Sequence, residues 1–214
     1  MTAPSYRPGY EGVRADIQEL VPRNCRNILE FGCSTGALGD ALKSRQGARV
    51  TGVELDGALA AEARGRLDEV VVGDVAAFVG DYEPEERFDC LIAADVLEHL
   101  ADPWQALRDV TRLLSPGATV VVSVPNVFYW SALLRAIRSQ RWPRDPEGTF
   151  DRTHLRWFGP EDARELLISA GLTDVSVYPR YWSAESRLRL VERLGRTSVG
   201  PFLAAQLRAV GIAP

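Results

Sequence analysis

A glycine-rich turn and two later acids are the residues best suited to bind a small ligand. Residues 30–39 read Glu-Phe-Gly-Cys-Ser-Thr-Gly-Ala-Leu-Gly, and a turn of this kind between a strand and a helix lets backbone N–H groups approach a ligand closely. Glu54 follows Glu30 by 24 residues, and Asp74 follows Glu54 by 20. An acid ending a second strand can accept both hydroxyls of a ribose, and an acid ending the third can accept a hydrogen bond from an exocyclic amine. The spacing therefore predicts a nucleoside site, with strand alternation favouring Glu54 over Asp56 as the ribose ligand.

Two histidines are the candidate bases, His99 and His154, and the sequence has no others. Imidazole has an unperturbed pKa of about 6.5, so either ring could take a proton at neutral pH. Each could instead only brace a loop by hydrogen bonds. Glu98, His99 and Asp102 form a conceivable metal cluster, but the cysteines are scattered and no clear ligand set emerges, so we expect no metal.

A segment rich in arginine and tryptophan surrounds His154. Arginine recognises phosphate or carboxylate through two parallel hydrogen bonds, which suggests an anionic acceptor with Arg152 among its ligands. The arginines could equally be solvated or paired with Asp145, Glu147 and Asp151. Asn126, directly after the predicted fifth strand, could orient the acceptor. The residues that define this segment are Arg135, Arg138, Arg141, Trp142, Arg144, Arg152, Arg156 and Trp157.

The elements that would position these residues alternate between strands and helices. Short apolar runs predict strands over 27–31, 49–54, 70–72, 88–94, 118–124 and 172–178, with 203–210 as a further candidate. Helices are expected over 10–20, 36–44, 57–66, 103–114 and 160–170. This alternation predicts an α/β fold with a doubly wound, Rossmann-like, mostly parallel seven-stranded sheet.

The alternation breaks between residues 126 and 158. A helix is expected over 127–139, a loop over 142–148, and another helix over 184–194. We interpret 126–158 as an inserted substrate lid over the carboxyl edge of the sheet, where open α/β sheets bind ligands. Residues 1–214 would then form a single domain.

Composition excludes several classes of protein. The chain has 214 residues, of which 46% are hydrophobic and 25% charged, as in globular proteins. It has no run of eighteen apolar residues and no apolar stretch near residue 1, so we expect no membrane span and no secretory signal. Three cysteines are too few for a disulfide framework, and free thiols indicate a cytoplasmic protein.

Charge is unevenly distributed along the chain. Residues 1–125 carry 12 basic and 20 acidic side chains, and residues 126–214 carry 13 and 9. An acidic half and a basic half could bind a cationic and an anionic ligand, although chance surface composition explains the asymmetry equally well. The pI is about 5.3 and no dense basic run occurs, so no nucleic acid partner is expected.

Several motifs together resemble the class I S-adenosylmethionine-dependent methyltransferases. ILEFGCSTGALG resembles the family's first motif, GVELD its second-strand acid and VVVGDV its adenine-binding step, while FDCLIAADVLEHLADP and LLSPGATVVVSVPN resemble its fourth and fifth strands. FDRTHLRWFGPED resembles the Asp-x-x-His-x-x-x-Phe segment of members that act on ubiquinone precursors, sugars and natural products. The likeness covers residues 10–178.

The resemblance implies a role for each matching residue of the donor site. Gly32 and Gly36, within the motif that begins near Glu30, would shape the loop around the methionine portion. Glu54, followed by Leu55, would hold the ribose. Asp74 would meet the adenine amine with Val75 beside the ring, and Ala94 would lie near the sulfonium. Ser34 replaces the middle glycine of most members, and we expect it to fit if its φ is negative.

These observations favour methyl transfer to a hydroxyl of a small-molecule acceptor, by in-line displacement. The acceptor would be a sugar, a nucleotide-linked sugar or a natural-product intermediate, and it could be anionic. N-methylation of an amine is the nearest alternative. A nicotinamide-dependent oxidoreductase and a non-catalytic donor-binding partner remain as other classes, and the chain could form a homodimer.

Overall fold

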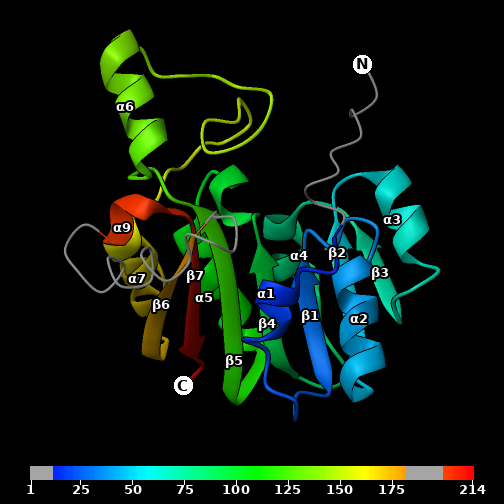
Figure 1. Cartoon of the computed structure of the whole chain (residues 1–214). Helices are drawn as coiled ribbons and strands as arrows, with labels where there is room; N and C mark the ends of the chain where they lie inside the picture. The colour runs from blue at the N-terminus through cyan, green and yellow to red at the C-terminus, as the bar shows by residue number, and fades with distance from the viewer. Residues whose placement is uncertain (1–11, 182–199) are drawn as a thin grey trace.

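The computed structural model describes residues 12–181 and 200–214, and they form one seven-stranded sheet flanked by helices (Figure 1). Its strands are β1 (Asn27–Phe31), β2 (Arg49–Glu54), β3 (Glu69–Val72), β4 (Phe88–Ala94), β5 (Leu114–Pro125), β6 (Thr173–Tyr181) and β7 (Ala204–Ile212). The α-helices are α1 (Ala15–Gln18), α2 (Ala37–Gln46), α3 (Gly57–Ala63), α4 (Val75–Asp81), α5 (Pro103–Val110), α6 (Trp130–Ser139), α7 (Pro160–Ser169) and α9 (Gly200–Leu203). Short 3₁₀ turns lie at η2 (Leu97–His99) and η3 (Thr111–Leu113).

The strand order is β3-β2-β1-β4-β5-β7-β6. Strands β1 to β5 pair in parallel, and β7 runs antiparallel between β5 and β6. In the register, Phe31 lies opposite both Val53 of β2 and Ala93 of β4. The residues that follow these three strands therefore meet at one edge of the sheet, which is the ligand-binding edge of open α/β sheets. The predicted fold class is confirmed.

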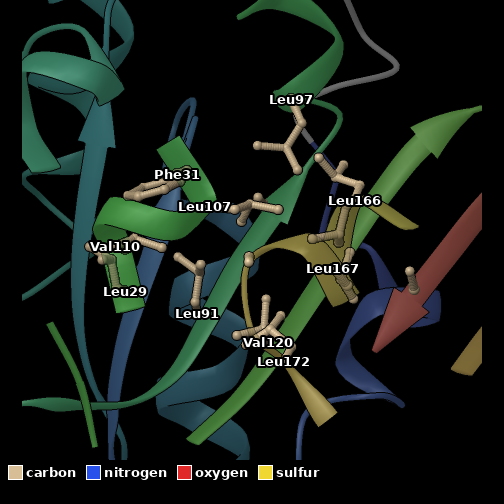
Figure 2. Packing of buried hydrophobic residues seen from close by; sticks show 14 of the residues in the cluster. Leu29, Phe31, Leu91, Leu97, Leu107, Val110, Val120, Leu166, Leu167 and Leu172 are labelled. Carbon is tan, nitrogen blue, oxygen red and sulfur yellow. The ribbon is translucent and has the colours of Figure 1, made fainter. Parts of the chain in front are cut away.

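Two hydrophobic clusters cover the two faces of the sheet. One contains apolar residues of α4, α5 and α7, and Figure 2 shows Leu29, Phe31 and Leu91 near Leu107 and Val110 of α5, with Leu166 and Leu167 of α7 beside each other. The other packs α1, α2 and α3 against the opposite face. Helices on both faces explain why the central strands are apolar almost throughout.

Acidic caps fix where three helices begin. The Asp56 side chain accepts from the N–H groups of Ala58 and Leu59 at the start of α3, and Asp74 does the same for Ala76 and Ala77 of α4. Asp102 caps α5. Each carboxylate satisfies backbone donors that have no partner within the helix, so the first two of these acids are tied to the turns that follow β2 and β3.

The observed elements differ from the predicted ones in several places. Among the described residues, from Gly12 onward, the helix expected over 10–20 covers Ala15–Gln18. The helix expected over 103–114 gives way to a 3₁₀ turn after Val110, so that β5 begins at Leu114. Helix α4 is absent from the predicted elements, because Asp74 was interpreted only as a ligand and its capping role was overlooked. The further strand candidate at 203–210 is confirmed as β7. The helix expected over 184–194 lies outside the described residues.

The insertion 126–158 contains one regular element, α6, which stands away from the sheet in Figure 1. None of the residues of α6 is buried. The rest of the insertion is irregular and is held by isolated bridges between Asp145 and Asp151 and between Asn126 and Phe158. Within 12–181 and 200–214, no helix is long and apolar enough to cross a membrane.

Candidate active site

A cavity of about 530 Å³ opens at the carboxyl ends of β1 to β4. This volume is in the range of small-molecule sites, and we call it the donor cavity. The predicted site residues that line it are Glu30, Gly32, Ser34, Glu54, Leu55, Asp74, Val75, Ala94 and His99. Of the described residues in its wall, none belongs to the insertion 126–158.

The Glu54 carboxylate bridges the glycine-rich turn and the end of β2. Its Oε2 accepts from the Ser34 N–H at 2.8 Å, and its Oε1 accepts from the Asp56 N–H at 2.8 Å. A carboxylate offers about four acceptor positions, so each oxygen keeps capacity for a ligand hydroxyl. Two backbone contacts fix this acid in the cavity wall, as a rigid ribose ligand requires.

Asp74 lies in the same wall, directly after β3. Its Oδ1 accepts from the Ala76 N–H at 2.8 Å and from the Ala77 N–H at 3.4 Å. Because the cap uses one oxygen, the carboxylate can also accept from a ligand amine. Glu54 and Asp74 thus face a common cavity from neighbouring strand ends.

The glycine-rich turn is built from three left-handed positions at 32, 34 and 36. Gly32 has φ +63°, and a Cβ there would lie 2.5 Å from Cγ2 of Val96. Gly36 has φ +79° and begins α2, but it does not line the cavity. The condition stated for Ser34 to fit, a negative φ, is not met, because its φ is +49°. This conformation points the Ser34 N–H at Glu54, and serine adopts it at a steric cost that glycine avoids.

Glu30 is a buried acid in the cavity wall, only 4% exposed. Burial, with a smaller contribution from the charge of Glu54, raises the pKa of Glu30 to about 8. Its Oε2 has no hydrogen-bond partner among the described residues. The acid is therefore protonated at neutral pH, and a cationic ligand group in the cavity would favour its ionised form.

Two residues of the cavity wall, Arg14 and Asp95, were not predicted as site residues. The Arg14 guanidinium donates to the Asp95 Oδ2 at 2.5 Å and to the Ser123 Oγ at 3.1 Å. The Asp95 Oδ1 also accepts from Ser123 and from the Gln206 side chain. Asp95 has φ +58° at the end of β4. With three partners the carboxylate holds the cavity wall together, and the pairing spans residues 14, 95 and 206, which no local pattern could show.

The two histidines lie side by side but play different parts. Their ring centroids are 4.7 Å apart in an edge-to-face arrangement. His99 lines the donor cavity, whereas His154 is 4% exposed and lies outside its lining. The His154 Nδ1 lies 3.1 Å from the Thr149 carbonyl oxygen. Both were predicted as bases, and only His99 is placed where it could meet a ligand in this cavity.

Glu98 is a buried acid close to both histidines. Its side chain is 1% exposed, and Oε1 lies 3.9 Å from the His154 Nε2. Burial, followed by the charge of Asp95, raises the pKa of Glu98 well above its ordinary value. Ligand atoms of Glu98, His99 and His154 lie within 4.8 Å of one another, close enough to hold a metal ion. The sequence suggested Glu98, His99 and Asp102 as a conceivable metal cluster. In the structure the third member is His154, and Asp102 caps α5 instead.

The residues predicted to bind the acceptor do not reach the donor cavity. Asn126 is fully buried: its Nδ2 donates to the carbonyl oxygens of Pro201 and Ala204 at 2.7 and 2.8 Å, and its Oδ1 accepts from the Phe128 N–H. The amide joins β5 to the start of β7, so an acceptor-orienting role for Asn126 is wrong for this geometry. Arg152 is exposed and is absent from the cavity wall.

One arginine and two tryptophans of the insertion have side-chain partners within it. Arg135 forms two hydrogen bonds to the Asp145 carboxylate, at 2.5 and 2.7 Å. The Trp142 ring packs edge-on against Phe150 and Trp157, at 5.0 Å from each. Arg135 is therefore paired with an acid of the insertion, which was the alternative to a role in binding an anionic acceptor.

The donor cavity fits S-adenosylmethionine by the chemistry of its wall. Glu54 offers acceptors for ribose hydroxyls, Asp74 an acceptor for an adenine amine, and Glu30 an orphaned buried oxygen near the glycine-rich turn. The acids that line the cavity are Glu30, Glu54, Asp56, Asp74 and Asp95. An acidic wall suits a ligand that carries a sulfonium and an ammonium.

Comparison with known proteins agrees with this geometry. A family model described as "Methyltransferase domain" matches residues 6–177. The ubiquinone biosynthesis O-methyltransferase of Xylella fastidiosa is 32% identical over 189 residues, which cover 85% of this chain and 75% of that protein.

Two solved structures share the fold. One is a SAM-dependent methyltransferase from Archaeoglobus fulgidus, with a TM-score of 0.67 and 19% identity over 94% of this chain and 90% of that one. The other is phosphoethanolamine N-methyltransferase 2 of Haemonchus contortus in complex with S-adenosylhomocysteine, with a TM-score of 0.64 and 18% identity over 94% and 52%. The extent of the family match goes against an oxidoreductase. The chain therefore belongs to the methyltransferase-domain family, and it is a class I S-adenosylmethionine-dependent methyltransferase.

Proposed function

We propose that this enzyme methylates a hydroxyl group of a small metabolite, with His99 as the general base. The observation that carries this proposal is the position of the His99 ring in the wall of the donor cavity, in the short turn η2 that follows β4. When bound, the donor would supply a methyl group attached to a positively charged sulfur. The acceptor oxygen would attack the methyl carbon in line with the carbon–sulfur bond, and the sulfur would leave as a neutral thioether.

The chain's own residues would do three things. Glu54 and Asp74 hold the adenosyl portion, the glycine-rich turn admits the methionine portion, and Ala94 leaves room at the end of β4. Orienting two reactants in this way can supply about 7–11 kcal/mol of barrier reduction. A hydroxyl also needs a base, and a positioned imidazole typically contributes about 10²- to 10⁴-fold.

The acceptor is proposed to be a sugar, a nucleotide-linked sugar or a natural-product intermediate that binds between the donor cavity and the insertion. Exposed arginines of the insertion, such as Arg152, support an anionic acceptor. We assign 126–158 as the lid of a single domain, because it follows β5 at the ligand-binding edge. A cytoplasmic location, the absence of nucleic acid and membrane partners, and a homodimer stay predictions.

Methyl transfer from labelled S-adenosylmethionine to an acceptor panel tests the proposal. The panel pairs each hydroxyl compound with its amine analogue, in neutral and phosphorylated forms. We expect labelled methyl ethers, with faster transfer to the phosphorylated hydroxyl compounds. Transfer to amines alone would replace the proposal by N-methylation. No transfer to any acceptor, although S-adenosylhomocysteine binds, would favour a non-catalytic donor-binding partner.

A further inference from the structure

Asp151 is a buried acid that the proposed reaction does not use. Its side chain belongs to the insertion, and the residue is 1% exposed. Its Oδ1 accepts from the Thr153 N–H at 2.8 Å and from the Thr153 hydroxyl at 2.7 Å. Because the hydroxyl directs its one hydrogen at Asp151, the Thr153 oxygen can only accept from any other neighbour.

The His99 ring meets two oxygens of Thr153. Its Nδ1 lies 3.2 Å from the Thr153 Oγ1 and 3.3 Å from the Thr153 carbonyl oxygen. A carbonyl oxygen accepts hydrogen bonds and never donates them. Because both of these oxygens accept, Nδ1 carries the hydrogen, and the neutral ring holds its lone pair at Nε2.

We propose that Asp151 and Thr153 are positioning residues that fix the tautomer of His99, so that Nε2 takes the proton of the acceptor hydroxyl. The proposal deepens the proposed function and rests on it for the role of His99. In this step the acceptor O–H bond breaks, its proton forms the Nε2–H bond, and Nδ1–H stays directed at Thr153. The ring becomes an imidazolium whose charge faces the Asp151 carboxylate across the Thr153 hydroxyl. An acid that orients a base from behind is the arrangement that activates many catalytic histidines.

The backbone around Thr153 is held independently of its hydroxyl. The N–H groups of Leu155 and Arg156 both donate to the Glu98 carbonyl oxygen, at 2.8 and 3.0 Å. Since Glu98 precedes His99 in η2, these bonds join the insertion to the turn that carries the base. Substitution of the Thr153 side chain should therefore leave the local fold in place.

Other ionisable groups also act on His99. Glu98 and the His154 ring belong to the same cluster, and the Arg14–Asp95 pair lies in the same cavity wall. The test must therefore keep these side chains in place. Asp151→Asn does so, because the amide oxygen can still accept both bonds from Thr153 while the charge is lost. Loss of this charge also removes one of the causes that raise the pKa of Glu98, so the Thr153 variants, which keep the charge, are compared with it.

Ring ¹⁵N NMR of the full chain measures the tautomer and the titration of His99 without any acceptor. The chain has two histidines, so the His99 signals are those lost in His99→Asn. We expect the Nδ1–H tautomer, and a titration midpoint about 0.5–1 unit lower in Asp151→Asn. Asp109→Asn, on α5 outside the cavity wall, should leave the midpoint unchanged. An Nε2–H tautomer, or the same midpoint in Asp151→Asn as in the parent chain, would overturn the proposal.

The pH dependence of kcat gives the second readout. Loss of the Asp151 charge should move the low-pH limb of the profile to lower pH by the same amount as the NMR midpoint. Thr153→Val should lower kcat, and Thr153→Ser, which keeps the hydroxyl, should restore it. A profile that does not move while the NMR midpoint does would contradict a positioning role. Absence of hydroxyl methylation would count against the proposed function alone, since the NMR measurements require no acceptor.

Discussion

The donor cavity and the insertion 126–158 lie at the same edge of one sheet but are built in opposite ways. In the cavity, Glu54 and Asp74 come from the ends of neighbouring strands, and their carboxylates accept from backbone N–H groups, those of Ser34 and Asp56 for Glu54 and those of Ala76 and Ala77 for Asp74. The insertion has one helix without buried residues, and its side chains are positioned by contacts outside regular elements, as between Arg135 and Asp145 and between Thr153 and His99. Ligand residues that follow a regular strand are thus positioned by the sheet, whereas those of an irregular segment depend on contacts that only the folded chain provides.

The largest effect should separate the two histidines. His99→Asn should lower kcat about 10²- to 10⁴-fold with little change in affinity for S-adenosylhomocysteine, because the ring lines the cavity without holding the adenosyl group. His154→Asn should lower kcat much less and thermal stability more, since this ring is buried. Steady-state kinetics and thermal unfolding check both. If His99→Asn and His154→Asn both fold well and lose kcat equally, the donor cavity and the insertion would not differ in the way described.

Loss of the ribose ligand should have the next largest effect. Glu54→Ala should weaken binding of S-adenosylhomocysteine about 100-fold, because hydrogen bonds to a charged group contribute about 1.5–3 kcal/mol each and the Ser34 N–H loses its acceptor. Arg152→Ala, in the insertion, is the matched control and should leave this affinity unchanged. Calorimetric titration of both variants measures it, and a comparable loss in the control would place the donor differently.

Asp74→Ala should weaken donor binding about tenfold, a loss of about 1.4 kcal/mol, as expected for one hydrogen bond to a carboxylate. His154→Ala should change it much less. Because Asp74 also caps α4, removal of the side chain should lower stability by about 1 kcal/mol. Asp74→Asn keeps the cap and separates the two effects. If Asp74→Asn binds S-adenosylhomocysteine as tightly as the parent chain, the carboxylate charge of Asp74 does not contribute to donor binding.

Glu30→Gln should change how stability depends on pH. The folded-state pKa of Glu30 is raised to about 8 from 4.5, so between these values the folded chain binds more protons than the unfolded one, and stability falls as pH rises. Glutamine removes this dependence, so the Tm of the variant relative to that of the parent chain should be several degrees higher at pH 8 than at pH 5. Parallel Tm curves for the two proteins would show that Glu30 is ionised throughout.

Ser34→Gly should have the smallest effect. Glycine adopts the observed φ of +49° without steric cost, although it also increases the entropy of the unfolded chain. The net gain should be at most about 1 kcal/mol in unfolding free energy, with unchanged or tighter donor binding. Denaturant unfolding measures the first and calorimetry the second. Weaker binding would show that the serine side chain itself contacts the donor.

The same contrast separates what the sequence could predict from what it could not. Strand ends, glycines and acids at regular spacing located the donor cavity, because parallel strands bring their carboxyl ends to one edge. Arg14 was missed, since it reaches Asp95 across the fold rather than through a motif. Asn126 was placed wrongly because its partners are Pro201 and Ala204, more than 70 residues along the chain. The tautomer of His99 depends on Thr153, 54 residues away, and no pattern in one sequence encodes that contact.

A crystal structure of the chain with S-adenosylhomocysteine bound would test the position of the donor most directly. We expect ribose hydroxyls on the Glu54 carboxylate, the adenine amine at Asp74, and the sulfur facing the space between Ala94 and His99. Product bound in the same cavity with its adenine away from Asp74 and its ribose away from Glu54, or bound elsewhere on the chain, would contradict the assignment of this cavity as the donor site.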